Sequence, residues 1–206
     1  MSVSIIENIA IDVVRRRVLT RCGYGKGAEI LPADAQLIES EFPKMMALAE
    51  PKIAIADFDV VVVKPDRIVI EGEIEIPGPR LAKYLAGARR VSLYAATIGP
   101  AVEQMSTALS ESGKVRAAFM WDCFGSEATE ATARRVSLIV HQRAKLAGLT
   151  NTVRFSPGYI DIPLRVNEVI LKLVEGDRIG VSVNEAGLLL PRKSTTGIIG
   201  WIPPRT

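Results

Sequence analysis

Histidine and cysteine are nearly absent from this sequence of 206 residues, which contains one histidine and two cysteines. A single histidine cannot build an imidazole metal cluster, and Cys22 and Cys123 do not form a C-x-x-C zinc motif. No Ser-His-Asp arrangement can be assembled around His141, and neither a P-loop nor an H-E-x-x-H motif occurs. The sequence therefore offers few catalytic groups, and both cysteines are expected to be reduced thiols.

Aromatic residues and long apolar runs are also scarce. Only 5% of the residues are aromatic, which leaves no platform for base stacking. The longest apolar strip, residues 53–63, is interrupted by Asp57 and Asp59, so no segment is expected to cross a bilayer. No basic segment precedes an apolar run at the N-terminus, so we expect no signal peptide and a cytoplasmic location.

The charge is slightly positive, at a formal +3, and it is dispersed. Nucleic-acid binding usually requires a concentrated basic stripe, so we expect no nucleic-acid partner. A mildly basic surface of this kind is able to meet an acidic protein partner. The arginine clusters lie at residues 15–17, 89–90 and 134–135.

The order of apolar patterns predicts an α+β fold. We expect one domain over residues 1–206, with a helical part at 1–50 and a part at 51–206 that holds the sheet and the site. The sheet is expected to be mainly antiparallel, with N-terminal helices and one long central helix. Helices are predicted at 3–20, 32–49 (kinked or broken at Pro43), 80–86, 101–110, 113–145 and 164–174. Strands are predicted at 52–63, 68–70, 73–76, 91–98, 152–155 and 194–201, with a hairpin of 179–183 and 188–191.

A glycine-rich stretch at residues 22–27 contains the pattern G-x-G-x-G. Nucleotide-binding loops of this kind follow a strand and open a helix, whereas this stretch follows a predicted helix. We therefore interpret it as a connection between two helices.

The six residues Arg154-Phe-Ser-Pro-Gly-Tyr159 combine a cation, a tight turn and an aromatic ring. Pro157 fixes its own φ, and Gly158 can adopt positive φ without steric cost, so the pair predicts a turn. The guanidinium of Arg154 suits a carboxylate or phosphate, and Tyr159 offers a π face and a hydroxyl. Such a set can cradle a zwitterionic ligand that resembles an amino acid.

This motif resembles the R-P-A-P-G-Y signature of the activation domain of cobalamin-dependent methionine synthase. The following chain, including residues 178–181 and 191–194, is similar to small single-domain relatives of that module, and residues 129–133 resemble its A-E-A-x-A segment. The resemblance implies that the chain binds S-adenosylmethionine over a cobalamin held by another protein. That partner would be a methionine synthase core or another corrinoid-binding protein, reduced by a donor such as flavodoxin, and the module would support reductive methylation of the cobalamin.

The resemblance also implies roles for five residues. Arg154 would bind the ligand carboxylate, Tyr159 would pack as a ring, and Glu130 would contact a cationic or hydroxyl group. Ser156 and Gly158 would contribute backbone groups near the adenosine or amino acid portion. Without the resemblance, Glu130 would be interpreted as an ordinary solvated carboxylate on a helix.

Two positions depart from the long form of the family. That form carries a glutamate six residues before the arginine, where this chain has Gly148, and a tyrosine near the C-terminus, where none follows Tyr159. No D-x-H-x-x-G cobalamin loop is present, so cobalamin is expected only through a partner and the chain is not a complete methionine synthase. Two alternatives remain: a protein-binding module of the same fold that has lost the ligand, and an independent methyltransferase, for which no base is evident.

Overall fold

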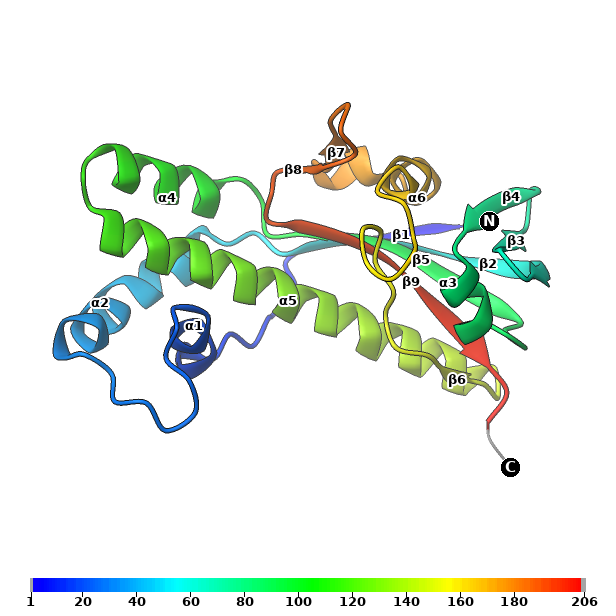
Figure 1. The fold of residues 1–206 in the computed structure, drawn as a ribbon, viewed down its shortest axis with the longest axis horizontal. Coiled ribbons are helices and arrows are strands. Elements are labelled where there is room, and N and C mark those ends of the chain that lie inside the picture. Colours follow the sequence, from blue (N-terminus) through cyan, green and yellow to red (C-terminus); the bar gives the residue numbers. More distant parts are fainter. Residues whose placement is uncertain (1, 205–206) are drawn as a thin grey trace.

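An antiparallel sheet of seven strands organises the molecule, which the computed structural model describes over residues 2–204 (Figure 1). Its strands follow the order β4-β3-β2-β5-β9-β6, and β1 pairs with β2 outside that path. All strand pairs in this sheet are antiparallel. The bounds are β1 Val3–Ile6, β2 Lys52–Lys64, β3 Arg67–Ile70, β4 Ile74–Pro77, β5 Arg90–Thr97, β6 Thr150–Asn151 and β9 Ser194–Ile202, and a separate hairpin consists of β7 Ser182–Val183 and β8 Leu189–Leu190.

Helices cover both faces of this sheet (Figure 1). The long helix α5 lies on one face, while α3, α6 and the short 3-10 helix η1 pack on the other. A third layer forms where α1, α2 and α4 pack against the N-terminal half of α5. The helices are α1 Arg15–Arg21, α2 Pro32–Leu48, α3 Pro79–Tyr84, α4 Ala101–Glu111, α5 Val115–Leu146, α6 Val166–Val174 and η1 Gly176–Ile179.

The residues of β5 alternate between the two faces of the sheet. Tyr94 and Ala96 pack toward α5, whereas Leu93 and Ala95 pack toward α6. Side chains of a strand point to opposite faces in turn, and here both faces are covered. This explains why the sequence of β5 reads as a continuous apolar run rather than an alternating one.

A buried polar network joins the sheet to α5. The indole of Trp201 donates to Ser92 Oγ at 2.8 Å, and Ser92 Oγ donates to Asp57 Oδ1 at 2.6 Å. Arg143 on α5 donates to the other oxygen of Asp57 at 3.0 Å and to Ser4 Oγ at 3.1 Å. The network thus connects four strands with the helix and satisfies polar groups that would otherwise be buried without partners.

The helix predicted at residues 3–20 is wrong in its first part. Residues Val3–Ile6 form β1, which pairs with β2 with Val3 opposite Ala56, and the helix begins only at Arg15. Valine and isoleucine are β-branched and fit a pleated surface, and β2 offers an edge on which they pair. The expected helical part at residues 1–50 therefore also contributes a strand to the sheet.

The expected α+β class, the antiparallel sheet and the long central helix are confirmed. Helix α2 continues through Pro43 without a break, because Pro43 and Glu39 both lie on the exposed side, where water can solvate the unpaired carbonyl. The glycine-rich stretch connects α1 to α2, as predicted. Across residues 2–204, no helix has the combination of length and apolar character that crossing a bilayer requires.

Candidate functional site

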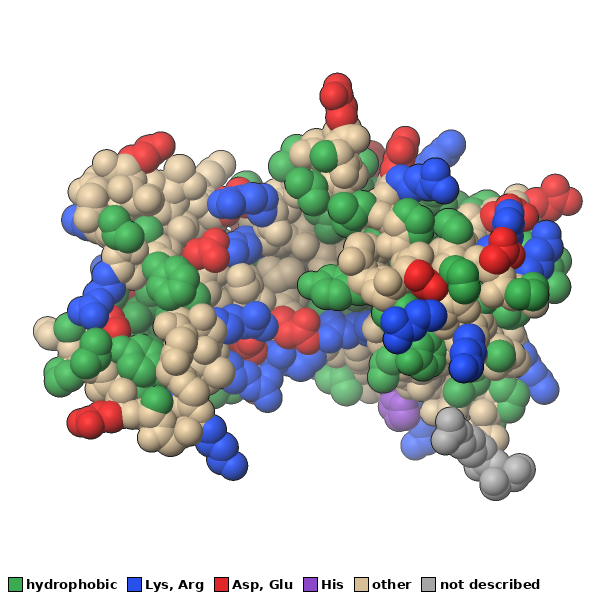
Figure 2. All heavy atoms as spheres, in the orientation of Figure 1, with side chains coloured by type: hydrophobic (Ala, Val, Ile, Leu, Met, Phe, Trp, Pro, Cys, Tyr) green, Lys and Arg blue, Asp and Glu red, His purple; other side chains and the backbone are tan. Residues whose placement is uncertain are grey.

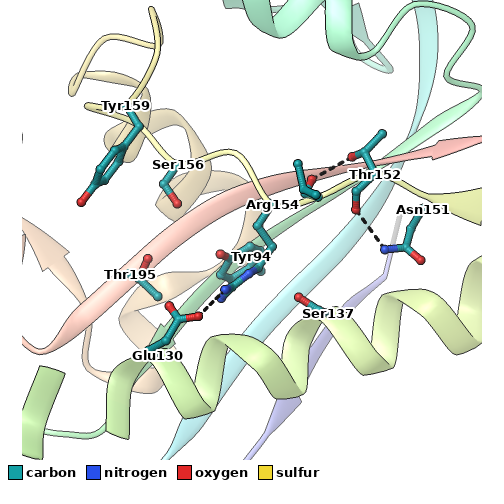
Figure 3. A pocket seen from close by; sticks show the side chains of 10 residues that line it. Tyr94, Glu130, Ser137, Asn151, Thr152, Arg154, Ser156, Tyr159 and Thr195 are labelled. Atoms are coloured by element: carbon teal, nitrogen blue, oxygen red, sulfur yellow. Dashed lines mark hydrogen bonds and ion pairs between the residues drawn. The ribbon is translucent and has the colours of Figure 1, made fainter. Parts of the chain in front are cut away.

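A bulge in the edge segment of the sheet positions Arg154. Thr150 lies opposite Ile202 of β9, and pairing resumes where Phe155 lies opposite Ile198. The edge segment advances five positions from Thr150 to Phe155, while β9 advances four from Ile202 to Ile198. One extra residue of the edge segment is therefore accommodated between the two pairs. Bulges of this kind redirect side chains beside functional sites. Here the side chain of Arg154 extends across the sheet toward α5 (Figure 3).

The residue after Arg154 anchors the motif on the opposite face. Phe155 is buried in the core that α3 and α6 cover, and its ring stacks on Tyr84 with centroids 5.3 Å apart. Farther along, Asp161 Oδ2 accepts a hydrogen bond of 2.6 Å from the backbone N–H of Arg80, in the first turn of α3. The loop that carries the motif is therefore fixed to α3 at two places.

The predicted Pro157-Gly158 turn is present, and Gly158 is required for it. Gly158 has φ +84°, and a Cβ at this position would lie 2.8 Å from Leu164 Cδ2. Its N–H donates to the carbonyl oxygen of Ile162 at 2.8 Å. The amide that we expected to face a ligand is thus used within the loop, and Gly158 contributes the shape of the turn.

Arg154, Ser156 and Tyr159 meet Glu130 of α5 around one cavity of about 660 Å³. In Figure 3 the motif and the helix lie on opposite sides of this cavity, with Tyr94 of β5 between them. Figure 2 shows this hollowed face of the molecule, with basic and acidic side chains alternating beside the hollow. The cavity is lined by Tyr94, Glu130, Ser137, Asn151, Thr152, Val153, Arg154, Ser156, Tyr159 and Thr195.

An ion pair between Arg154 and Glu130 spans the cavity. Arg154 Nη2 lies 2.5 Å from Glu130 Oε1, and Arg134 Nη1 approaches the same oxygen at 4.0 Å. Burial opposes the charge on Arg154, but neighbouring Tyr94 and Glu130 outweigh it and raise the pKa of the guanidinium. Both arginines therefore approach the same oxygen of Glu130.

A second carboxylate, Glu127, lies one turn earlier on α5 and is 3% exposed. Arg21 and Arg134 contact it at 2.9 Å and 2.8 Å, and Arg17 lies 3.7 Å away. Burial acts to raise the pKa of Glu127, but its hydrogen bonds to Arg134 and Arg21 outweigh burial and hold the pKa below the ordinary value. Together with the pair above, four arginines surround two glutamates, and of these six residues Arg154 and Glu130 line the cavity.

Tyr94 forms the floor of the cavity and was not predicted from the sequence. It is 1% exposed, and burial raises the pKa of its phenol, which therefore remains a neutral hydrogen-bonding group. Gly197 lies opposite Tyr94 on β9, and a Cβ there would lie 2.6 Å from the tyrosine ring. The close approach of the ring to β9 thus depends on a glycine.

A smaller cavity of about 360 Å³ continues from the first, since Ser156, Tyr159 and Thr195 line both. Its other walls include the apolar residues Leu164 and Leu188. The phenol ring of Tyr159 is 73% exposed and lies between the two cavities. The arrangement suits an elongated ligand that has a charged end and a less polar end.

No group of three or more potential metal ligands occurs among residues 2–204. His141 does not line the cavity; its Nδ1 lies 2.9 Å from Asn151 Oδ1 on the exposed surface. The cavity is lined by charged groups, Arg154 and Glu130, and by the aromatic residues Tyr94 and Tyr159.

Among solved structures, the chain is similar to the MetH reactivation domain bound to AdoHcy. The TM-score is 0.71, and the match covers 100% of this chain and 80% of that chain at 15% sequence identity. At this identity the likeness establishes the shared fold, which confirms the fold inferred from the R-F-S-P-G-Y motif. No protein-family model matches the sequence, and no curated protein does.

The structure brings together four of the five residues predicted for the site: Glu130, Arg154, Ser156 and Tyr159. Gly158 does not line the cavity and instead shapes the loop. Gly148, in the turn after α5, does not line the cavity. Tyr94 and Thr195 were missed because they lie in strands whose sequence gives no sign of which residues lie opposite them. Gly197 could have indicated this site, since an isolated glycine within a strand often marks a place where another group closely approaches the backbone.

Proposed function

We propose that this chain binds S-adenosylmethionine in the cavity between α5 and the 154–159 loop and acts as a reactivation module for a separate corrinoid-binding protein. The observation that carries the proposal is the convergence of Arg154 and Glu130, from segments 24 residues apart in the sequence, on one open cavity. S-adenosylmethionine, when bound, would supply a sulfonium methyl group for reductive methylation of the partner's cobalamin. The chain's own residues would hold and orient it.

The residues present fit such a ligand. The cavity of about 660 Å³ lies within the ordinary range of roughly 300–1,000 Å³ for small-molecule sites. Arg154 suits the carboxylate of the amino acid portion, and the carboxylate of Glu130 suits an ammonium or hydroxyl group. The smaller cavity beside Tyr159 provides apolar and aromatic walls for a heterocycle.

Arg154 is assigned to the ligand carboxylate. Its side chain is 23% exposed and that of Glu130 39% exposed, so a ligand can reach both from the cavity. The existing pair holds the guanidinium extended over Tyr94 before the ligand arrives, which reduces the ordering required on binding. A carboxylate would share or replace the contact with Glu130.

Positioning is the contribution expected from the protein in methyl transfer. Methyl transfer from a sulfonium requires alignment of donor and acceptor rather than proton transfer, so effective catalysis depends on orientation. The partner would be a methionine synthase core or another corrinoid protein, reduced by a donor such as flavodoxin. Tyr159 is exposed and lines the cavity, and we expect the ligand to face the partner on this side.

Calorimetric titration with S-adenosylmethionine and S-adenosylhomocysteine tests the binding site. Loss of a charge-assisted contact costs about 1.5–3 kcal/mol, so Arg154→Ala should weaken binding roughly 10- to 100-fold. Arg178→Ala is a matched control, because Arg178 also pairs with a glutamate at 2.5 Å but does not line the cavity. Wild-type protein that binds neither compound, or an Arg154→Ala variant that binds as well as wild type, would contradict the proposal.

A second candidate is a protein-binding module of the same fold that has lost the ligand. The Arg154–Glu130 ion pair favours it, because the guanidinium already has a partner within the chain. This candidate predicts no heat on titration with either compound, together with association with a corrinoid protein that Arg154→Ala leaves unchanged.

A further inference from the structure

Three arginines converge on one buried carboxylate where α1 packs on α5. Arg21 Nε lies 2.9 Å from Glu127 Oε2. On the other oxygen, Oε1, Arg134 Nη2 lies at 2.8 Å and Arg17 Nη1 at 3.7 Å. Figure 2 shows basic side chains gathered near the place where α1 and α5 meet in Figure 1. None of these four residues lines either of the two cavities described above, so the cluster lies outside them.

The spacing of these residues along their helices produces the convergence. Arg17 and Arg21 are four residues apart on α1, and Glu127 and Arg134 are seven residues apart on α5. Each pair therefore lies on one face of its helix. Val18, which follows Arg17, is buried in the core that α1 shares with α5 and holds the short helix in place. Packing of the two helices thus brings the two charged faces together.

Glu127 does not neutralise this cluster. Three positive charges face its one negative charge, which leaves an excess of two. A second carboxylate, Glu130, lies 4.0 Å from Arg134 but pairs more closely with Arg154, at 2.5 Å. The side chain of Glu127 is 4% exposed, whereas those of the three arginines are 35–55% exposed. Solvent therefore meets the positive part of the cluster.

Most donors of these guanidinium groups have no partner in the part of the chain that the structure describes, residues 2–204. Within it, Arg21 donates only through Nε and Arg134 only through Nη2. The contact of Arg17 with Glu127 is too long for a hydrogen bond. A guanidinium has five N–H donors in a planar fork that matches the oxygens of a phosphate group. The remaining donors can therefore bind a second anion beside Glu127.

We propose that Arg17, Arg21 and Arg134 form a binding site for a doubly charged phosphate group, either inorganic phosphate or a phosphate monoester. The excess of two positive charges matches a dianion, whereas a single carboxylate would leave one charge uncompensated. Three forks in one place also suit an anion that carries several oxygens on one centre. The inference concerns this cluster alone and holds whether or not the cavity binds the ligand proposed above.

The test titrates inorganic phosphate and methyl phosphate separately into the full chain at about pH 8, where phosphate carries close to two negative charges. Ionic strength is held constant with sodium chloride, because salt screens exposed charges. Two-dimensional ¹H–¹⁵N NMR should show saturable shifts of the backbone amides in α1 and in residues 127–134 of α5. The probe that binds more tightly shows whether the site prefers free or esterified phosphate.

Substitutions assign the binding to the cluster. Arg17→Gln should weaken phosphate binding roughly 10-fold or more, because it removes a charge-assisted contact. Arg16→Gln is the matched control: it removes the same charge from the neighbouring position, but Arg16 donates to the carbonyl oxygen of Gly25 and makes no contact with Glu127. This control should bind phosphate nearly as well as wild type. Glu127→Gln should tighten phosphate binding, because it removes the competing negative charge.

The proposal is overturned if phosphate causes no saturable shift in α1 or α5 beyond that of sodium chloride. It is equally overturned if Arg16→Gln weakens binding as much as Arg17→Gln, or if Glu127→Gln weakens it. Tighter binding of a peptide of consecutive glutamates than of either phosphate compound would also overturn it, and would identify the cluster as a surface for an acidic protein.

Discussion

The packing of Tyr94 against Gly197 leads to a quantitative prediction for Gly197→Ala. The new Cβ would lie 2.6 Å from the ring and 2.7 Å from the hydroxyl oxygen, closer than real side chains approach. Tyr94 is 1% exposed and packs between the sheet and α5, so a shift of its ring would disturb that packing. The substitution should therefore force a shift in the floor of the cavity.

The magnitude follows from two opposing effects. A glycine within a strand is less favourable than alanine by roughly 0.5–1 kcal/mol, so the substitution would stabilise the protein at an unobstructed position. Overpacking of a buried site costs about 1–3 kcal/mol. We expect a net loss of about 1–2 kcal/mol, which corresponds to a fall in Tm of roughly 2–8 °C.

Urea unfolding followed by tryptophan fluorescence measures this loss. Both tryptophans, Trp121 and Trp201, are buried and lie on α5 and β9, so they report on the layers that meet at Tyr94. Gly25→Ala is the control, because Gly25 lies in open space, and this variant should be no less stable than wild type.

A double-mutant cycle identifies the cause. In a Tyr94→Ala background the obstructing ring is gone, so Gly197→Ala should cost nothing further. The reasoning would be refuted if Gly197→Ala is as stable as wild type, or if it destabilises the Tyr94→Ala protein by the same amount as the wild type.

Three further substitutions test other parts of the structure. Ser92→Ala should cost about 1–3 kcal/mol in urea unfolding, because it leaves the buried indole N–H of Trp201 without its acceptor and removes one donor to Asp57. Glu127 has a lowered pKa in the fold, so its ion pairs stabilise fully above its ordinary value of 4.5 and are lost as the pH falls through the lowered pKa. Thermal melts from about pH 6 down to about pH 3 should accordingly show a smaller loss of Tm for Glu127→Gln than for wild type. Gly158→Ala should lower the free energy of ligand binding, measured by calorimetry, by more than it lowers the free energy of unfolding, because it disturbs a surface loop at positive φ.

The sequence by itself was sufficient to predict the turn at residues 157–158 and the charged and aromatic residues beside it. Proline and glycine at 157 and 158 restrict the local backbone whatever surrounds them, and the structure contains the turn they predict. The long central helix was also predictable, since its apolar periodicity extends over many turns. Residues Val3–Ile6 were assigned wrongly because a short apolar segment fits the periodicity of a helix as well as that of a strand. Pairing with the edge of β2 makes this segment a strand.

Tertiary structure alone decided which residues share the cavity. The position of Arg154 depends on a bulge that exists only because the edge segment pairs with β9, and strand pairing is not encoded in local spacing. Tyr94 entered the site through the register that sets it opposite Gly197. Propensity and turn chemistry act between near neighbours in the chain, whereas these contacts arise from long-range packing between distant segments.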